Sequence, residues 1–135
     1  MRYTRFDEFP VWQESVVFAA DVYLLCKNGD LEKEYRIRGQ LFAAATSIPS
    51  NIAEGFEYDN NRQFSRFLSY AKGSAGEVHS QLCILHAAGL IDAESFLRFS
   101  TRSRDLARKI GGLIRYLSKE GHHGFRFPLN ERDLK

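Results

Sequence analysis

Polar side chains recur at helical spacing in one stretch of the chain, and a second stretch adds further groups whose types could support chemistry. The first set follows spacings of seven, four and three residues, at Gln40, Ser47, Asn51 and Glu54. The second set, within residues 71–77, is Lys72, Ser74 and Glu77. Spacings of three, four and seven residues place side chains on one face of an α-helix, so the first set predicts a polar stripe.

Three interpretations of these polar residues are open. The favoured one is a structural hydrogen-bond network that fixes helix register or a subunit contact, because buried polar groups must be paired. The second is a binding site for a phosphate or a peptide, which would use Lys72 and the backbone freed near Pro49. The third is acid–base catalysis by Glu54 or Glu77, but no nucleophile–base pair or metal set accompanies them. We therefore expect a protein that is not an enzyme.

The histidines and cysteines do not form a ligand set. His79 and His86 are seven residues apart on one helical face, but no acidic residue or third ligand completes a metal site. Cys26 and Cys83 form no CxxC pair. We expect no metal ion and no cofactor. Residues 1–9 lack the apolar segment of a secretory signal, so we expect reduced thiols in a cytoplasmic protein.

The composition is that of one globular domain. The chain has 135 residues and a mass of 15.5 kDa, with 44% hydrophobic and 27% charged residues. Three prolines and ten glycines are too few for a disordered or fibrous chain. The longest hydrophobic stretches, which Asp21 separates, are shorter than the roughly 20 residues that a membrane span needs. We expect no membrane association.

Charge is distributed unevenly along the chain. The net charge of +2 is too small to indicate nucleic-acid binding by itself. Residues 1–97 carry nine basic and thirteen acidic side chains, whereas residues 98–135 carry ten basic and four acidic ones. Cationic side chains flank both sides of the apolar face of the last predicted helix, with Arg98, Arg102 and Lys109 on one side and Arg104, Arg108 and Arg115 on the other. The candidate nucleic-acid contacts are Lys72, Arg104, Arg108 and Arg115.

Hydrophobic periodicity predicts four helices that must position these residues. The predicted bounds are residues 10–27, 31–56, 61–88 and 93–118. No stretch alternates with period two for long enough to predict a sheet. The expected fold is therefore all-α, an antiparallel up-down four-helix bundle at residues 1–118 with a tail at residues 119–135. In the tail, Phe125 and Phe127 could dock on a neighbouring chain, but the expected state of this segment is a frayed end.

Three of the predicted helices carry features that a plain bundle does not need. Apolar residues nearly encircle the first helix, leaving a strip at Glu14 and Asp21, so we expect burial against a partner subunit. In the second helix, Pro49 should cause a kink near Thr46, and Gly55 is expected to end the helix. The third helix carries a stripe of small residues that we expect to contact another helix of the same chain closely. This small-residue stripe consists of Ser65, Ser69, Gly73, Gly76, Ser80 and Cys83.

Four tracts of the chain also resemble a known family. They are FPVWQ at residues 9–13, QL at residues 40–41, SIPSNIAEG at residues 47–55 and AKGS at residues 71–74. With these tracts the chain resembles the bacterial four-helix-bundle proteins encoded by intervening sequences within 23S rRNA genes, also called the S23-like family. The resemblance covers about residues 6–117. It implies a four-helix bundle that assembles as a closed ring, a homopentamer.

The resemblance implies less about function. Most members have no established biochemical activity, and the label "ribosomal protein" is historical. A related bundle, the accessory protein of diversity-generating retroelements, also forms a pentamer and engages nucleic acid and a reverse transcriptase. Members commonly have basic residues just after the Gln-Leu pair, where this chain has Phe42 and Ala43. This departure weakens a nucleic-acid surface on the second helix and favours a hydrophobic contact there.

The sequence therefore predicts a cytoplasmic, non-enzymatic, homo-oligomeric protein that binds or scaffolds other molecules. RNA binding through backbone phosphates is the alternative, because a ring would repeat each basic patch once per subunit. The chain shows no RRM, KH or OB pattern that would supply aromatic residues for base stacking. The identity of the partner stays open.

Overall fold

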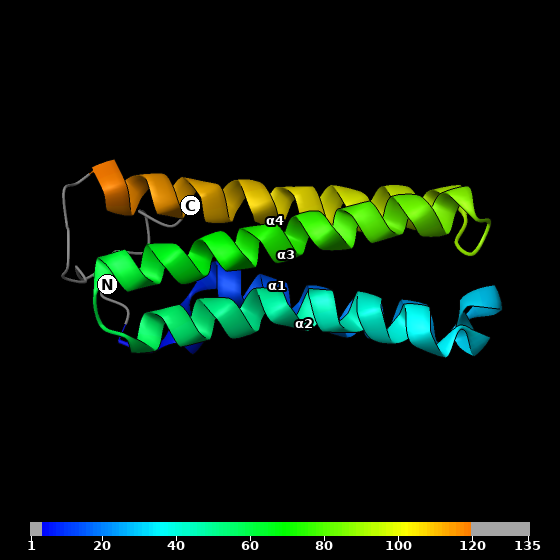
Figure 1. Cartoon of the computed structure of the whole chain (residues 1–135), viewed down its shortest axis with the longest axis horizontal. Helices are drawn as coiled ribbons and strands as arrows, with labels where there is room; N and C mark the ends of the chain where they lie inside the picture. The colour runs from blue at the N-terminus through cyan, green and yellow to red at the C-terminus, as the bar shows by residue number, and fades with distance from the viewer. Residues whose placement is uncertain (1–3, 120–135) are drawn as a thin grey trace.

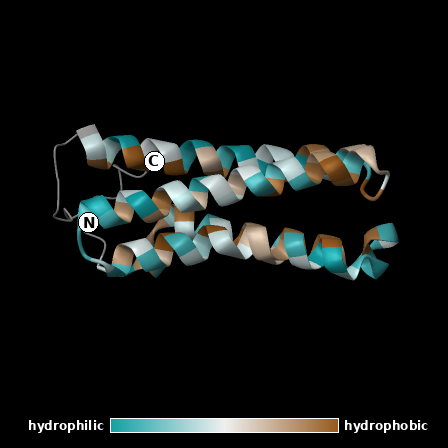
Figure 2. Cartoon of the chain, viewed as in Figure 1, coloured by the Kyte–Doolittle hydropathy of each residue, from teal (hydrophilic) through white to brown (hydrophobic). Residues whose placement is uncertain are grey.

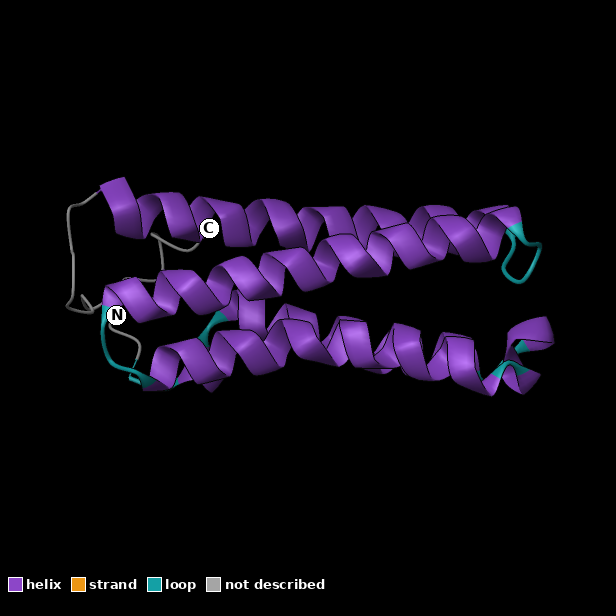
Figure 3. Cartoon of the chain, viewed as in Figure 1, coloured by secondary structure: helices purple, strands orange, loops and turns teal. Residues whose placement is uncertain are grey.

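The computed structural model describes residues 4–119, and within this range every regular element is helical (Figure 3). The four main helices are α1 (Pro10–Cys26), α2 (Tyr35–Glu57), α3 (Asn61–Ala87) and α4 (Ala93–Lys119). Short 3₁₀ helices, η1 (Phe6–Glu8) and η2 (Gly29–Lys33), precede α1 and α2. The predicted all-α class with four helices is confirmed. The tail predicted at residues 119–135 lies outside the described residues, apart from Lys119, which ends α4.

Local chemistry accounts for where the helices begin. Pro10 occupies the first turn of α1, where a missing N–H costs no hydrogen bond. Asn60 caps α3, because its side-chain oxygen accepts the backbone N–H of Gln63 at 2.9 Å. Asp92 precedes α4 and accepts the backbone N–H of Ser95 at 2.7 Å. This hydrogen bond lowers the pKa of the Asp92 carboxyl, since it stabilises the charged form.

The start of the second helix differs from the prediction. The sequence pattern predicts a helix from residue 31, whereas α2 begins at Tyr35. The preceding residues form η2, which buries Leu31 in the core. Gly29 begins η2 with a φ of +61°, a conformation that glycine adopts without a steric penalty. The apolar residue at position 31 therefore belongs to the loop and not to the apolar stripe of α2.

The prediction that Gly55 ends the second helix is wrong. Gly55 lies inside α2, which continues to Glu57, and it is buried. A β-carbon at Gly55 would lie only 2.6 Å from the Cβ of Phe67 in α3. Glycine at this position therefore lets α2 and α3 approach closely. Pro49 also lies within α2, which runs through it as one continuous helix.

The four helices run alternately up and down and pack in the cyclic order α1, α2, α3, α4 (Figure 1). The α2–α3 and α3–α4 contacts are the most extensive, and the α1–α4 contact is the smallest of the four. Helices α1 and α3 therefore lie on a diagonal of the bundle, and their outward faces point away from each other. The end of α4 lies at the same end of the bundle as the start of α1.

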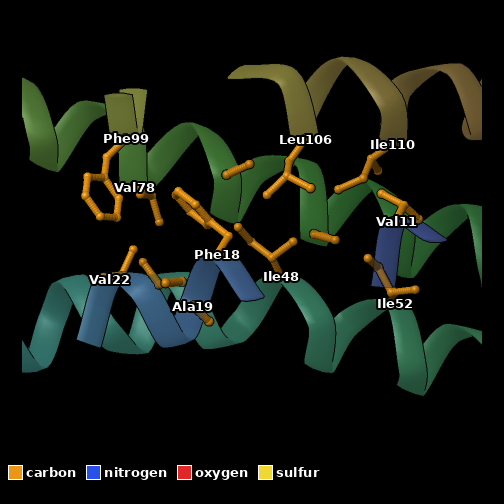
Figure 4. Packing of buried hydrophobic residues seen from close by; sticks show 14 of the residues in the cluster. Val11, Phe18, Ala19, Val22, Ile48, Ile52, Val78, Phe99, Leu106 and Ile110 are labelled. Atoms are coloured by element: carbon orange, nitrogen blue, oxygen red, sulfur yellow. The ribbon is translucent and has the colours of Figure 1, made fainter. Parts of the chain in front are cut away.

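The hydrophobic core runs along the axis of the bundle. Side chains from all four helices meet there, including Phe18, Ile48, Val78 and Leu106, which are completely or almost completely buried (Figure 4). Burying a side chain of this size contributes about 1.5–3 kcal/mol. Hydrophobic and hydrophilic residues alternate along the helices, as expected for amphipathic elements (Figure 2). The core therefore accounts for one apolar face of each helix.

Candidate functional site

Part of the polar stripe forms a hydrogen-bonded link between α2 and α3. Ser74 of α3 donates its hydroxyl to Oγ of Ser47 at 2.9 Å. Asn51 donates its side-chain amide to Oγ and to the carbonyl oxygen of Ser47, at 2.9 and 2.8 Å. All three side chains are half-buried. This arrangement favours the structural interpretation for these residues, because a satisfied polar network fixes the register of two packed helices.

The other members of the predicted polar set lie apart from this link. Gln40, Glu54 and Glu77 are exposed, and none of them forms a side-chain hydrogen bond or an ion pair with any residue in 4–119. Among the described residues, neither Glu54 nor Glu77 therefore lies beside a side chain that would orient its carboxyl group as a catalytic acid or base. Within the same described range, no three His, Cys, Asp or Glu residues are grouped so that they could hold a metal ion. The ring of His86 instead stacks on Phe96, with ring centroids 4.6 Å apart.

Two of the predicted nucleic-acid contacts converge on the backbone of one glycine. The Nζ of Lys72 lies 3.6 Å from the position that a β-carbon on Gly111 would take, and Nη1 of Arg115 lies 3.4 Å from the same position. Since Gly111 has no side chain, both cationic groups reach one point on the surface of α4. Like charges held this close repel each other, and a bound anion would relieve that repulsion. The signal in the sequence was the four-residue spacing of Gly111 and Arg115, but the approach of Lys72 required the fold.

The remaining two candidates extend this basic surface along α4. Arg104 and Arg108 precede Arg115 by eleven and seven residues, spacings that place all three on one side of the helix. Arg108 forms an ion pair with Asp105 at 2.5 Å, and its hydrogen bond lowers the pKa of the Asp105 carboxyl. Among the described residues, Arg104, Arg115 and Lys72 have no ion-pair partner. We call the four candidates together the α3–α4 basic face.

The side of α4 that faces α1 carries two cations that pair with acidic residues of α1. Arg102 pairs with Asp21 at 2.8 Å, and Lys109 pairs with Glu14 at 2.9 Å. The hydrogen bond to Glu14 raises the pKa of the Lys109 ammonium group, because it stabilises the charged form. Both pairs join α4 to the polar strip that interrupts the apolar surface of α1. They explain why the strip at Glu14 and Asp21 exists in an otherwise apolar helix.

An apolar groove of about 700 Å³ opens on the surface between α1 and α2. We call it the α1–α2 groove, and its walls include Trp12, Val16, Tyr23, Phe42, Pro49 and Ala53. The rings of Tyr23 in α1 and Phe42 in α2 contact each other in its wall, tilted by 53° with centroids 5.3 Å apart. Phe42 therefore makes a hydrophobic contact, in agreement with the interpretation of its departure from the family pattern. The sequence did not predict the groove, because a groove depends on how two helices are placed relative to each other.

The outward ridge of α1 beside the groove is also apolar. Val17 and Leu24 are each 56% exposed, and Tyr23 is 43% exposed. Contiguous exposed apolar surface of this kind is typical of interaction sites in folded proteins. We call the groove and this ridge together the α1–α2 face.

The prediction that the small-residue stripe of α3 contacts another helix of the same chain is wrong. Gly73 and Gly76 are exposed, and a β-carbon on either would meet no atom within 4 Å. Ser80 and Cys83 are exposed too. The stripe faces outward because the apolar stripe of α3, which includes Leu82, occupies the side that faces the core.

The fold and these surfaces define an antiparallel four-helix-bundle protein. No helix in the described part of the chain is both long and apolar enough to cross a membrane. The chain belongs to the 23S rRNA-intervening sequence protein family, whose model matches residues 7–112. The family predicted from the sequence tracts is therefore confirmed.

The fold is shared with a solved structure. A protein of unknown function from the S23 ribosomal protein family of Bacteroides thetaiotaomicron is 24% identical to this chain, with a TM-score of 0.71. The match covers 78% of this chain and 98% of that chain. A comparison with curated proteins gives no match. The comparisons thus supply the family and the fold.

Proposed function

We propose that this protein is a non-enzymatic interaction protein that assembles with copies of itself through the α1–α2 face. The observation that carries the proposal is the exposure of the α1 ridge, where Val17 and Leu24 remain more than half exposed beside an apolar groove. Covering one such half-exposed side chain contributes about 1 kcal/mol. A face with several of these side chains and a groove gives a second copy enough apolar surface for a specific contact.

A closed ring, which the family resemblance implies as a homopentamer, needs two different surfaces on every copy. The outward stripe of α3 supplies a second surface, because Gly73 and Gly76 would allow another backbone to come close. Each glycine inside a helix costs about 1 kcal/mol relative to alanine, and no contact with residues 4–119 offsets this cost. Since α1 and α3 lie on a diagonal of the bundle, the two surfaces point apart, as a head-to-tail contact requires. This geometry supports a ring over an isologous dimer.

The native mass of a charged variant tests the self-association. We expect the unmodified protein to form an oligomer and the Val17→Glu, Leu24→Glu variant to have the mass of a single chain, because unpaired charges are costly to bury. Tyr35→Glu is the matched control, since Tyr35 is 75% exposed and lies outside the groove. An unchanged mass in the double variant contradicts the placement of the contact. A single-chain mass for the unmodified protein at all concentrations contradicts the proposed function.

A variant on α3 separates a ring from an isologous dimer. Ile84 is 63% exposed and shares the outward side of α3 with Gly73, eleven residues earlier. In a head-to-tail ring, Ile84→Glu should dissociate the assembly as the α1 variant does. If Ile84→Glu leaves the mass unchanged while the α1 variant dissociates, the contact is isologous and the ring is excluded.

Binding of RNA by the α3–α4 basic face is a second candidate function. The observation that favours it is the convergence of Lys72 and Arg115 over Gly111, in a region where Arg104 also has no ion-pair partner among the described residues. Cations without acidic partners are available for phosphate groups, which bind proteins mainly through lysine and arginine. In an assembled ring the basic face would be repeated in every subunit, which raises the overall affinity for a long polyanion.

Fluorescence anisotropy with a structured 23S rRNA fragment at two salt concentrations tests this function. The triple variant Lys72→Ala, Arg104→Ala, Arg115→Ala should bind more weakly, and the slope of log affinity against log salt should fall by about 0.7–0.9 for each phosphate that the variant no longer neutralises. A control with Lys27→Ala, Lys33→Ala and Arg36→Ala removes three exposed charges elsewhere. Equal weakening in both variants, or no binding at low salt, contradicts a specific basic site.

A cytoplasmic location is also part of the proposal. Both cysteines are free thiols in the structure, Cys26 buried and Cys83 exposed, and unpaired thiols are typical of a reducing compartment. Fractionation of cells that express the protein would test the location directly, and recovery in a secreted fraction would contradict it.

A further inference from the structure

A cleft that differs in chemistry from the α1–α2 groove lies where the end of α1 meets the start of α4. We call it the α1–α4 cleft, and its volume is about 390 Å³. Its walls include Leu24 and Leu25 of α1 and Arg98, Phe99 and Arg102 of α4. Protein sites that enclose small molecules have volumes of about 300–1,000 Å³. The cleft is therefore large enough for a small organic ligand.

Of the two cationic side chains in the cleft, one is neutralised and the other is not. Arg102 pairs with Asp21 at 2.8 Å. Arg98 forms no ion pair with any residue in 4–119, and this includes Glu94, which lies one helical turn earlier. Two arginines and one aspartate are the charged residues of the lining, so its net charge is +1. The cleft therefore carries one positive charge that no acidic side chain balances.

The ring of Phe99 holds the unpaired guanidinium group in place. The Cζ atom of Arg98 lies 5.1 Å from the centroid of this ring, and the Cζ atom of Arg102 lies 5.5 Å from it. Stacking on an aromatic ring restricts a guanidinium group without neutralising its charge. The planar donors of a guanidinium group match the two oxygens of a carboxylate. Arg98 is thus positioned to receive an anionic group of this shape.

The surroundings of Arg98 favour a ligand with one negative charge and an apolar body. Leu24 and Leu25 form an apolar wall, which a small inorganic anion would leave uncovered. A neighbouring hollow shares Leu25 with the cleft, and its charged lining residues among those described are Asp30 and Asp92. These two carboxylates repel a second negative charge, so a phosphate monoester, with a charge of about −1.5 to −2, fits less well. A small organic monocarboxylate meets both conditions.

We propose that the α1–α4 cleft binds a small organic acid, whose carboxylate pairs with Arg98 and whose hydrocarbon part packs against Leu25 and Phe99. This inference goes beyond the proposed function and does not rest on it. The cations of the cleft lie on α4, and Leu24 is the one residue that the cleft shares with the α1–α2 face. Binding of the acid is therefore measurable whether or not the protein assembles with copies of itself.

Titration of the isotope-labelled full-length protein with 3-phenylpropanoate, followed by the chemical shifts of its backbone amides, tests the site. We expect saturable shifts centred on Ser95 and Phe99, which line the cleft. The neutral amide 3-phenylpropanamide keeps the apolar body and loses the charge, so it should bind about tenfold more weakly. Acetate keeps the carboxylate and loses the apolar body, so it should also bind about tenfold more weakly.

A pair of arginine variants identifies the cation. Arg98→Ala should weaken the binding of 3-phenylpropanoate about tenfold, because the carboxylate loses its charged donor. Arg104→Ala is the matched control, since Arg104 is also an exposed arginine of α4 without an ion-pair partner among the described residues, but it does not line the cleft. The control should leave the affinity unchanged. Both side chains are exposed, so the melting temperatures of the two variants should equal that of the unmodified protein.

Each alternative outcome overturns the proposal. Equal affinity for the acid and its amide means that no cation takes part. Equal affinity in the Arg98→Ala and Arg104→Ala variants means that Arg98 does not hold the carboxylate. Largest shifts at Trp12 and Phe42 mean that the acid occupies the α1–α2 groove, and the absence of saturable shifts up to about 10 mM means that the cleft does not take such acids. Native mass, measured on the same samples, tests the proposed function separately.

Discussion

Gly55 is the position where one added carbon should disturb the bundle most, because α2 and α3 meet through it. A β-carbon there would lie 2.6 Å from Cβ of Phe67 and 3.3 Å from Cδ1 of Phe64. The carbonyl oxygen of Phe64 would be 3.4 Å away. Carbon atoms in favourable contact are about 3.5–4.0 Å apart, so the first distance is too short by about 1 Å. A Cβ atom is fixed to its backbone, and Gly55→Ala must therefore push α3 away from α2.

Two opposing effects set the size of this change. Alanine stabilises a helix interior by about 1 kcal/mol relative to glycine. Inserting a carbon into a well-packed contact costs about 1–3 kcal/mol, and the upper part of that range applies where the neighbour cannot rotate away. We expect the free energy of unfolding of Gly55→Ala to be about 1–2 kcal/mol lower than that of the unmodified protein.

Urea unfolding followed by circular dichroism measures this difference at a fixed protein concentration. Gly39→Ala is the matched control, since Gly39 is helical and exposed, lies outside the proposed subunit contacts, and an added β-carbon there would meet no atom within 4 Å. This control should raise the free energy of unfolding of the chain by about 0.5–1 kcal/mol. The same substitution should thus have opposite signs at two positions of α2. If Gly55→Ala is as stable as the unmodified protein or more stable, the reasoning from close approach is refuted.

Three further outcomes follow from other contacts. Ser47→Ala should lower the free energy of unfolding by about 1–2 kcal/mol, because the hydroxyl of Ser74 loses its acceptor. Glu54→Ala should change the free energy of unfolding little, because Glu54 is exposed, and urea unfolding compares the two variants. An alkylating reagent should modify Cys83 before Cys26, because burial raises the pKa of the Cys26 thiol and shields it; mass spectrometry of partly modified protein gives the order. Hydrogen bonding at the start of α4 lowers the pKa of Asp92, so its carboxylate stabilises the fold at neutral pH and this contribution is lost as the pH falls through the folded-state pKa. Asp92→Asn should flatten that part of the acid dependence of the melting temperature.

The helices could be predicted from the sequence because their signals are local. The period of the apolar residues and the turn residues between them place the starts of α1, α3 and α4 at the predicted residues. The start of α2 was missed because Leu31 is apolar and buried, yet it belongs to η2. A buried apolar residue in a loop has the same pattern as one in a helix.

The candidate site could be predicted only in part, since its features depend on contacts between helices. The Ser47–Ser74 hydrogen bond joins residues 27 positions apart, and spacing within one helix says nothing about such a pair. The position of Lys72 over Gly111 likewise depends on the contact between α3 and α4. The small-residue stripe was predicted to contact another helix of the same chain, but it is exposed. Small side chains allow a close approach, but they do not indicate whether the approaching helix belongs to the same chain.

Helix α1 has the smallest contact with α4 of the four neighbouring pairs, and part of that contact is ionic. Besides apolar contacts such as Phe18 against Phe99, α1 is joined to α4 by the Arg102–Asp21 and Lys109–Glu14 pairs, whose side chains are about one-third exposed. Ion pairs in such positions stabilise a fold by at most about 1 kcal/mol each and weaken in salt. The ion pairs weaken in salt, whereas the core contacts of α1, such as Phe18 against Phe99 of α4, do not depend on them. We therefore expect high salt to loosen α1 more than the other helices, and amide exchange measured at two salt concentrations would test this.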